Sequence, residues 1–317
     1  MFWGRQDVYA KRGVNKETGK AAYYPQCNNL WTSGCHRKLK DGINCKDCKI
    51  RSYKTITKFI ILNHLQGNSY NGSDVIGVYP LFSNGTCRFM VFDFDNHDKG
   101  AEETDFANVD NTWIEEVEAM REICVLNGID PLVERSRSGK GAHVWIFFDK
   151  PIAASLVRKF GFALLDKGAE QVNLKSFNYY DRMLPAQDSL SDNSSLGNLI
   201  ALPLQGEALK DGNSAFIDGN WNAYPDQWKI LFSKPRLSQE FLEEKIKEWT
   251  NSIGNIVADA DESDREKPWN RMQHFNKNDV DGKIHITLSN GIYVDNTNLK
   301  ASMQNRIRRM AAISNPI

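Results

Sequence analysis

The sequence predicts a mixed fold of the α/β or α+β class. Strand-like and helix-like stretches alternate through the middle of the chain, which is typical of both classes. The 317 residues are 41% hydrophobic and 25% charged, which indicates a globular protein with room for two or three compact units. No apolar run approaches the roughly 20 residues of a membrane span, and the N-terminus lacks the apolar stretch of a signal peptide. We therefore expect a cytoplasmic protein without a membrane partner.

The first half supplies helices and strands in alternation. Residues 54–67 predict a helix that ends at Gly67. Residues 75–81 and 87–95 predict strands, and the turn "FSNGT" joins them. Residues 110–128 predict a helix that Asp110 or Asn111 can cap and that Gly128 ends. Its apolar stripe consists of Trp113, Val117, Met120 and Cys124.

The second half continues this pattern and then becomes helical and polar. Residues 142–148 predict a strand that is apolar on both faces, and residues 155–168 predict a helix. From about residue 236 the pattern is helical, beginning with 238–253, and residues 255–283 are charged without clear periodicity. The remaining expected elements are strands at 131–136, 177–184 and 197–204, a hairpin at 285–296 and a basic helix at 299–314.

Four of the six cysteines, Cys27, Cys35, Cys45 and Cys48, fall close together near the N-terminus. Four thiolates suit tetrahedral zinc, and a small loop-rich segment needs such a bound ion to be stable. His36 could replace Cys27 as a ligand, and the alternative interpretation is four free thiols in a reduced loop. The segment is also basic, so it is either a solvated face or a surface that contacts phosphates.

The strand at 87–95 ends in two carboxylates. Because side chains alternate along a strand, Asp93 and Asp95 share one face with Val91, while Phe92 and Phe94 share the other. Like charges this close repel unless a cation lies between them, and hard oxygen ligands suit Mg²⁺ or Mn²⁺. Acids at strand ends also cap turns or bind lysines, so this pair alone is a weak signal.

Two further stretches carry groups that suit phosphate and metal chemistry. A turn rich in serine, glycine and lysine precedes the strand that carries His143, and its backbone N–H groups and Lys140 can cradle a phosphate. A lone strand histidine is more often a core residue, but beside this turn it could donate to a triphosphate. Asp181, with Asp188 further on, could complete a two-metal site, and Asn198 could contact sugar or base.

In this order, the three stretches resemble the archaeo-eukaryotic primase superfamily of primase-polymerases. Its pattern of h-D-h-D, s-x-H and h-D is similar to "FDFD" (92–95), "GKGAH" (139–143) and "YD" (180–181). The chain looks closer still to the branch of TOTE conflict systems and CRISPR-associated primase-polymerases. That likeness covers roughly residues 2–235 and includes "GRQDVYAKR", the four cysteines, "GVYPL", "DRMLPAQD" and "GNLIALPLQG". In one departure, Gly141 stands at the serine position, so Ser138 is expected to act instead.

The resemblance implies an α+β fold with an RRM-like antiparallel sheet, flanking helices and an αβ unit. It implies a zinc module at residues 1–53, a catalytic core at 54–235 and a mostly helical extension at 236–317. Asp93, Asp95 and Asp181 would hold two Mg²⁺ or Mn²⁺ ions, with Asp188 in reserve. The residues expected to bind nucleotide are Ser138, Lys140, Gly141, His143, Arg137 and Asn198.

The expected activity is template-directed synthesis and extension of primers. The expected partners are single-stranded or primed DNA and dNTPs or NTPs, with a helicase or CRISPR adaptation module in the full-length protein. Two other functions use the same residues differently. A metal-dependent nuclease could use the acids, and a zinc-stabilised nucleic-acid binding module would need no catalysis.

Overall fold

The computed structural model describes residues 1–14, 19–45, 47–69, 72–96, 112–171, 178–191, 195–253, 285–287 and 293–295. Its contacts divide the chain into two units, residues 1–265 and residues 266–317. Helices and antiparallel sheets make up the first unit, which confirms the predicted mixed fold. The predicted domain boundaries at 53/54 and 235/236 both lie inside this unit.

The central sheet contains the strands that the sequence marks most clearly. β4 (Thr86–Asp95) lies between β6 (Gly141–Ala153) and β7 (Tyr180–Leu184), and β5 (Leu132–Arg135) pairs with the other edge of β6. All these neighbours are antiparallel. The short β9 (Arg236–Leu237) pairs in parallel with β6 at Phe147 and Phe148, beyond the residues of β6 that pair with β5. The long shared register of β4 and β6 makes this pair the framework of the sheet.

A second sheet has the order β2-β1-β3-β8. β3 (Ile76–Val78) and the short β8 (Ile200–Ala201) lie within predicted strands, whereas β1 (Ala10–Val14) and β2 (Ala21–Pro25) were not predicted. β1 pairs with both β2 and β3 in antiparallel register. Residues 10–14 therefore share a sheet with residues 76–78, which are distant in sequence.

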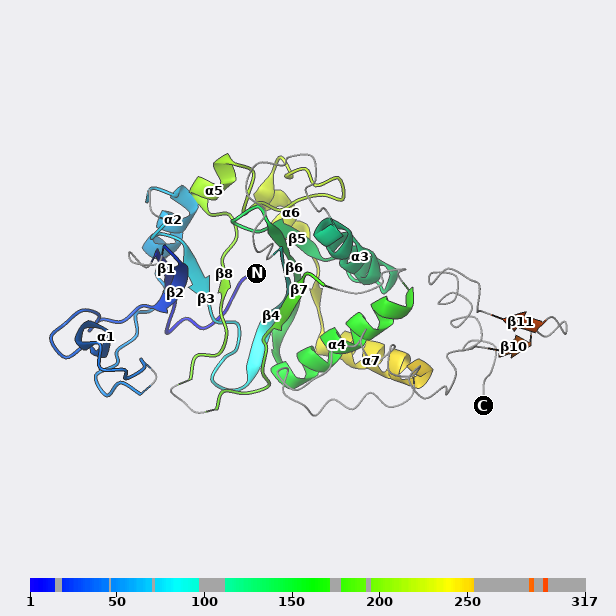
Figure 1. The fold of residues 1–317 in the computed structure, drawn as a ribbon, viewed down its shortest axis with the longest axis horizontal. Coiled ribbons are helices and arrows are strands. Elements are labelled where there is room, and N and C mark those ends of the chain that lie inside the picture. The colour runs from blue at the N-terminus through cyan, green and yellow to red at the C-terminus, as the bar shows by residue number, and fades with distance from the viewer. Residues whose placement is uncertain are drawn as a thin grey trace. The chain divides into compact units, whose positions relative to one another are not determined.

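Helices cover the face of the central sheet that points away from β1–β3 (Figure 1). α3 (Thr112–Leu126) and α4 (Ala154–Gln171) contact β4 and β6, and α7 (Gln239–Ile253) packs on α4. Met90 and Met183 lie against Gly161 of α4, where a Cβ would clash with both sulfur-bearing side chains. Gly161 therefore permits the close approach of α4 to the sheet.

The shorter helices follow their local signals. α2 (Lys58–Gln66) begins later than predicted because the side chain of Thr57 accepts a hydrogen bond from the backbone N–H of Ile60, and Gly67 ends it with φ 66°. Three other helices were not predicted: α1 (His36–Leu39), α5 (Gly206–Lys210) and α6 (Gln227–Ser233). Their few turns carry too little periodicity to identify from sequence.

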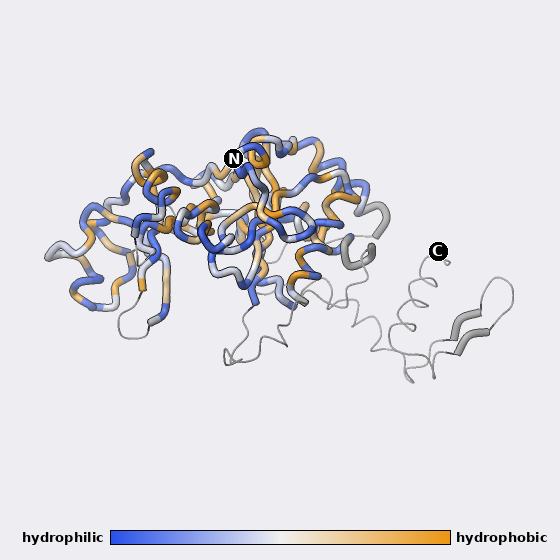
Figure 2. The backbone as a smooth tube through the Cα atoms, turned by 90° about the horizontal axis from the view of Figure 1, so that it is seen from above, coloured by the Kyte–Doolittle hydropathy of each residue, from blue (hydrophilic) through white to orange (hydrophobic). Residues whose placement is uncertain are grey.

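One hydrophobic core joins the two sheets. It combines Val91 and Trp145 of the central sheet with Val78 of β3 and Ile200 of β8, and all four are buried. Phe2 packs edge-on against Trp145, with ring centroids 4.8 Å apart. In Figure 2 hydrophobic stretches run through the middle of this unit and hydrophilic stretches follow its outer turns. The polar groups of the central sheet lie next to this core, as described below.

In the second unit, β10 (His285–Thr287) and β11 (Tyr293–Asp295) form an antiparallel pair. This pair confirms the predicted hairpin. The predicted connection at 255–283 and the predicted helix at 299–314 lie outside the described residues.

Candidate active site

One face of the central sheet carries a row of polar side chains from four strands. The register places Glu134 opposite His143, His143 opposite Asp93, and Asp93 opposite Arg182. Residues directly opposed across antiparallel strands point to the same face. The next row on this face is apolar and consists of Leu132, Trp145, Val91 and Leu184. The polar row therefore begins where the core between the sheets ends.

His143 is held between two carboxylates. Its Nδ1–H donates to Glu134 Oε2 at 2.9 Å, and its Nε2 lies 3.4 Å from Asp93 Oδ1. An ionised carboxylate only accepts hydrogen bonds, so each ring nitrogen faces its carboxylate as a donor. The two contacts together hold the orientation of the imidazole ring. The indole Nε1–H of Trp145 donates to the same oxygen of Glu134 at 2.9 Å. Glu134 is only 2% exposed, so its charge is satisfied by these two partners.

These contacts set the charge of the histidine. Burial by itself lowers the pKa of His143, but the charge of Glu134 and the hydrogen bonds and charge of Asp93 outweigh it and raise the pKa to about 10. Burial raises the pKa of Asp93, but the hydrogen bond from His143 and the charge of Arg182 prevail and lower it. At neutral pH the row thus contains an imidazolium beside a carboxylate.

A β-bulge brings Asp181 to Asp93. Asp93 pairs with Arg182 and Phe94 pairs with Tyr180, so Asp181 is an extra residue in β7. Arg182 Nε lies 3.3 Å from Asp93 Oδ2 and 3.6 Å from Asp181 Oδ2. One guanidinium therefore bridges the two carboxylates, which come from different strands.

Asp95 and Gly141 lie at the end of the β4–β6 pair. Asp95 is the last residue of β4, it shares the face of Asp93 by alternation, and it pairs with Gly141. A Cβ at Gly141 would clash with the carbonyl oxygen of Phe94. The glycine at the expected serine position is thus required by the close approach of the two strands.

The predicted phosphate turn is the hairpin between β5 and β6. Ser136 N–H donates to Gly141 O at 2.8 Å, and Gly139 has φ +75°. Ser138 and Lys140 are exposed there, and the Lys140 N–H donates to Ser138 Oγ at 3.3 Å. The pKa of Arg12 in β1 is lowered mainly by burial and further by the charge of Arg137. Arg137 therefore lies near β1. The turn thus presents basic and hydroxyl groups beside the acidic row.

Two of the expected residues lie elsewhere. Asp188 forms an ion pair with Arg158 of α4 at 2.5 Å, and its carbonyl oxygen lies next to Gly85, just before β4 begins. Asp188 is therefore at the opposite end of β4 from Asp93. Asn198 is exposed and lies two residues before β8, which belongs to the second sheet.

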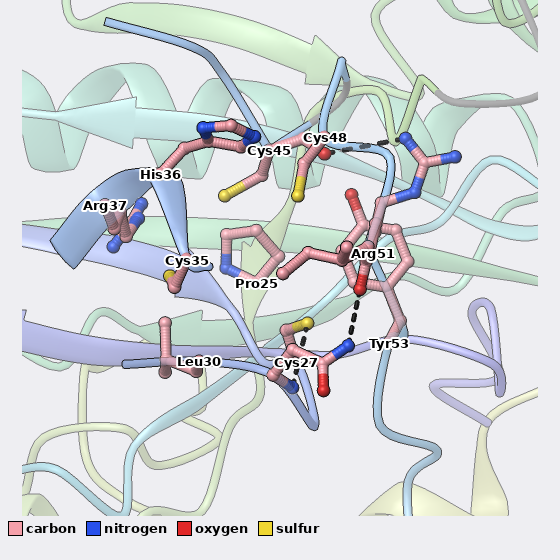
Figure 3. Close-up of a pocket in the computed structure, with 12 residues that line it drawn as sticks. Pro25, Cys27, Leu30, Cys35, His36, Arg37, Cys45, Cys48, Arg51 and Tyr53 are labelled. Carbon is pink, nitrogen blue, oxygen red and sulfur yellow. Dashed lines mark hydrogen bonds between the residues drawn. The ribbon is translucent and has the colours of Figure 1, made fainter. Parts of the chain in front are cut away.

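The four N-terminal cysteines line one cavity of about 30 Å³, together with His36 (Figure 3). Cys27 Sγ accepts hydrogen bonds from the backbone N–H groups of Asn29 and Ser52, both at 3.4 Å. The backbone N–H of Trp31 is the main cause that lowers the pKa of the Cys35 thiol. N–H donors to sulfur favour thiolates, which are the form that binds zinc. The donor set therefore fits the predicted zinc ion.

Within the described ranges, no three His, Cys, Asp or Glu side chains are arranged closely enough to hold a metal. In the acidic row the cation between Asp93 and Asp181 is the guanidinium of Arg182. Carboxylate oxygens are nevertheless the ligand type that Mg²⁺ and Mn²⁺ prefer.

Sequence reasoning missed Glu134 and Arg182. Glu134 directly follows the apolar Leu132 and Val133 in β5, and a carboxylate at such a position is a signal for a buried partner. Arg182 gave no such signal, because regular alternation would place it on the opposite face from Asp181. Only the bulge brings both side chains to Asp93.

The comparison with protein-family models gives a match over most of the chain. Residues 1–245 match the model of the "TOTE conflict system, Archaeo-Eukaryotic Primase domain". Among solved structures, the polymerase domain of Mycobacterium tuberculosis Ligase D in complex with DNA is similar at 16% identity and a TM-score of 0.31. That likeness covers 83% of this chain and 86% of the other. The comparison with curated proteins gives no match. Across the described residues, no helix is both long and apolar enough to cross a membrane.

Proposed function

The chain belongs to the family of archaeo-eukaryotic primase domains of TOTE conflict systems, and we propose that it is a template-directed primase-polymerase. It would join dNTPs or NTPs into primers on single-stranded DNA and extend primed templates. The observation that carries the proposal is the row in which the His143 imidazolium lies beside Asp93, with Asp181 bridged to the same carboxylate. Nucleotidyl transfer needs both kinds of charge in one place.

The acidic end of the row would bind the catalytic metals. We assign Asp93, Asp95 and Asp181 to two Mg²⁺ or Mn²⁺ ions, and we leave out Asp188 because Arg158 holds it at the other end of β4. Such ions supply activation of a 3′-hydroxyl and stabilisation of the leaving pyrophosphate. The protein's own part is to hold the three carboxylates on one face of a rigid sheet.

The basic end would hold the incoming nucleotide. His143 Nε2 points along the row toward Asp93, where it can donate to a phosphate oxygen. Lys140, Ser138 and Arg137 on the adjoining hairpin turn would contact the triphosphate further out, and Gly141 keeps β6 close to β4. Asn198 stays a candidate for the sugar or base.

The cysteine segment would be a zinc module that helps to hold template. Its four sulfurs line one cavity, and backbone N–H groups already point at two of them. Arg37 and Arg51 lie at the same cavity and would give the module a positive surface for phosphates.

One assay separates this function from the two alternatives. The protein is incubated with a labelled primed template, dNTPs and Mn²⁺. We expect extension, whereas shortening would indicate a nuclease and an unchanged primer would indicate a binding module. The double variant Asp93→Ala plus Asp95→Ala should abolish extension and keep DNA binding. Its matched control, Glu243→Ala plus Glu244→Ala, removes two exposed carboxylates of α7 and should extend normally.

A further inference from the structure

We propose that Arg182 is an internal counter-ion of the acidic row, which holds Asp93 and Asp181 together before divalent ions bind and which a bound ion displaces. This inference rests on the proposed metal-dependent function. It assigns a positioning role to Arg182, which lies within "DRMLPAQD" but does not belong to the predicted ligand set.

The geometry gives Arg182 the place that a cation would take. Its Nε lies 3.3 Å from Asp93 Oδ2 and 3.6 Å from Asp181 Oδ2. The first of these contacts is a hydrogen bond to a carboxylate whose side chain is 12% exposed. A carboxylate this buried needs a compensating charge, and the carboxylate of Asp181, whose side chain is 40% exposed, adds like-charge repulsion unless a cation lies between the two. The His143 imidazolium faces Oδ1 of Asp93, and Arg182 supplies the positive charge on the Oδ2 side, where Asp181 lies.

The same contacts make Arg182 a competitor of the metal. A divalent ion that binds between Asp93 and Asp181 requires the oxygens that the guanidinium now contacts. Two cations at one carboxylate pair repel each other, so the guanidinium must leave for the ion to enter. Arg182 has room to do so, because its side chain is 39% exposed, whereas His143 is enclosed by Glu134 and Asp93.

Removing the competing charge should therefore strengthen metal binding. We expect Arg182→Gln to bind Mn²⁺ at least about fivefold more tightly than the wild type, the lower end of ordinary coupling between two ligands. Arg182→Lys keeps the positive charge and should stay within about twofold of the wild type. Arg88→Gln makes the same charge change near the start of β4 and should bind like the wild type.

The test is Mn²⁺ titration of the full chain without nucleotide, by calorimetry or by the loss of the free-ion electron paramagnetic resonance signal. Thermal unfolding with EDTA and with saturating Mn²⁺ is measured in parallel. Arg182→Gln should lose stability in EDTA and regain it with Mn²⁺, since the ion replaces the missing charge. Mn²⁺ affinity that is unchanged or weaker in Arg182→Gln overturns the proposal, and so does a variant that Mn²⁺ does not restore to the folded state.

The same titration separates this inference from the function on which it rests. A wild-type protein that binds no Mn²⁺, or that binds it equally well after Asp93→Ala plus Asp95→Ala, would refute both the metal site and the role of Arg182. A wild type that binds Mn²⁺ at these aspartates and extends primers, while Arg182→Gln binds it no more tightly, would refute only the role of Arg182.

Discussion

Replacing Glu134 with alanine should destabilise the protein strongly. The carboxylate is 2% exposed and accepts hydrogen bonds from His143 Nδ1–H and Trp145 Nε1–H, both at 2.9 Å. Alanine leaves both buried donors without their acceptor and removes one of the two charges that face the imidazolium. Breaking a buried ion pair by removing one partner costs about 3–5 kcal/mol, and we expect that loss in the free energy of unfolding. Glu134→Gln keeps an acceptor and should lose about 1–3 kcal/mol.

The pH dependence of the free energy of unfolding tests the same ion pair of Glu134 and His143 by a second measurement. Since folding raises the pKa of His143 from its ordinary 6.5 to about 10, its contribution to stability is complete below pH 6.5 and is lost as the pH rises toward 10. Each pH unit in this window costs up to about 1.4 kcal/mol, so the whole effect is at most roughly 5 kcal/mol. Glu134 is the largest cause that raises this pKa, and both variants should therefore lose less stability at alkaline pH.

The assay is urea unfolding between pH 6 and pH 9.5, with EDTA present so that no metal contributes. Trp145→Phe is the control, because it removes one donor to Glu134 but keeps the ion pair with His143. It should be less stable than the wild type and keep the wild-type pH slope. If Glu134→Gln kept both the wild-type stability and the wild-type slope, the ion pair between Glu134 and His143 would not have the role described.

Three other perturbations test separate parts of the fold. Gly161→Ala places a Cβ against the methionines of the sheet and should cost about 1–3 kcal/mol in urea unfolding, while Gly219→Ala, which meets nothing nearer than 4.0 Å, should be neutral. Burial lowers the pKa of His64, so wild-type stability should fall as the pH drops below 6.5, and His64→Gln should lose this dependence in the same assay. Elemental analysis should find about one zinc ion per chain. The variant Cys45→Ser should lose this zinc, whereas Cys87→Ala should keep it. A metal-free wild type would contradict the zinc assignment.

Local patterns were sufficient to predict the framework of the central sheet. The strand predicted at 87–95 is β4, and the stripe of Trp113, Val117 and Met120 faces inward on α3. These elements are long and their apolar spacing is regular. β1 and β2 were not predicted, because most of their residues are only partly buried and because the pairing of β1 with β3 joins distant parts of the chain.

The candidate site was predictable in its residue types but not in its grouping. Motif order singled out Asp93, His143 and Asp181, and the structure brings these three together. The roles of Glu134 and Arg182 depend on strand register, which decides which side chains are neighbours and which local periodicity does not reveal. Asp188 was the reserve for Asp181 in the sequence prediction, and the structure places it beside Arg158 and Gly85, at the opposite end of β4 from Asp93.

The extra residue in β7 makes the site sensitive to chain length as well as to side-chain chemistry. A deletion of one residue there could preserve every acid and base of the motif and still turn the third acid away from the first. A design that transfers this site to another sheet would have to copy the β-bulge together with the residues. Matching side chains on evenly paired strands would reproduce the composition of the site without its arrangement.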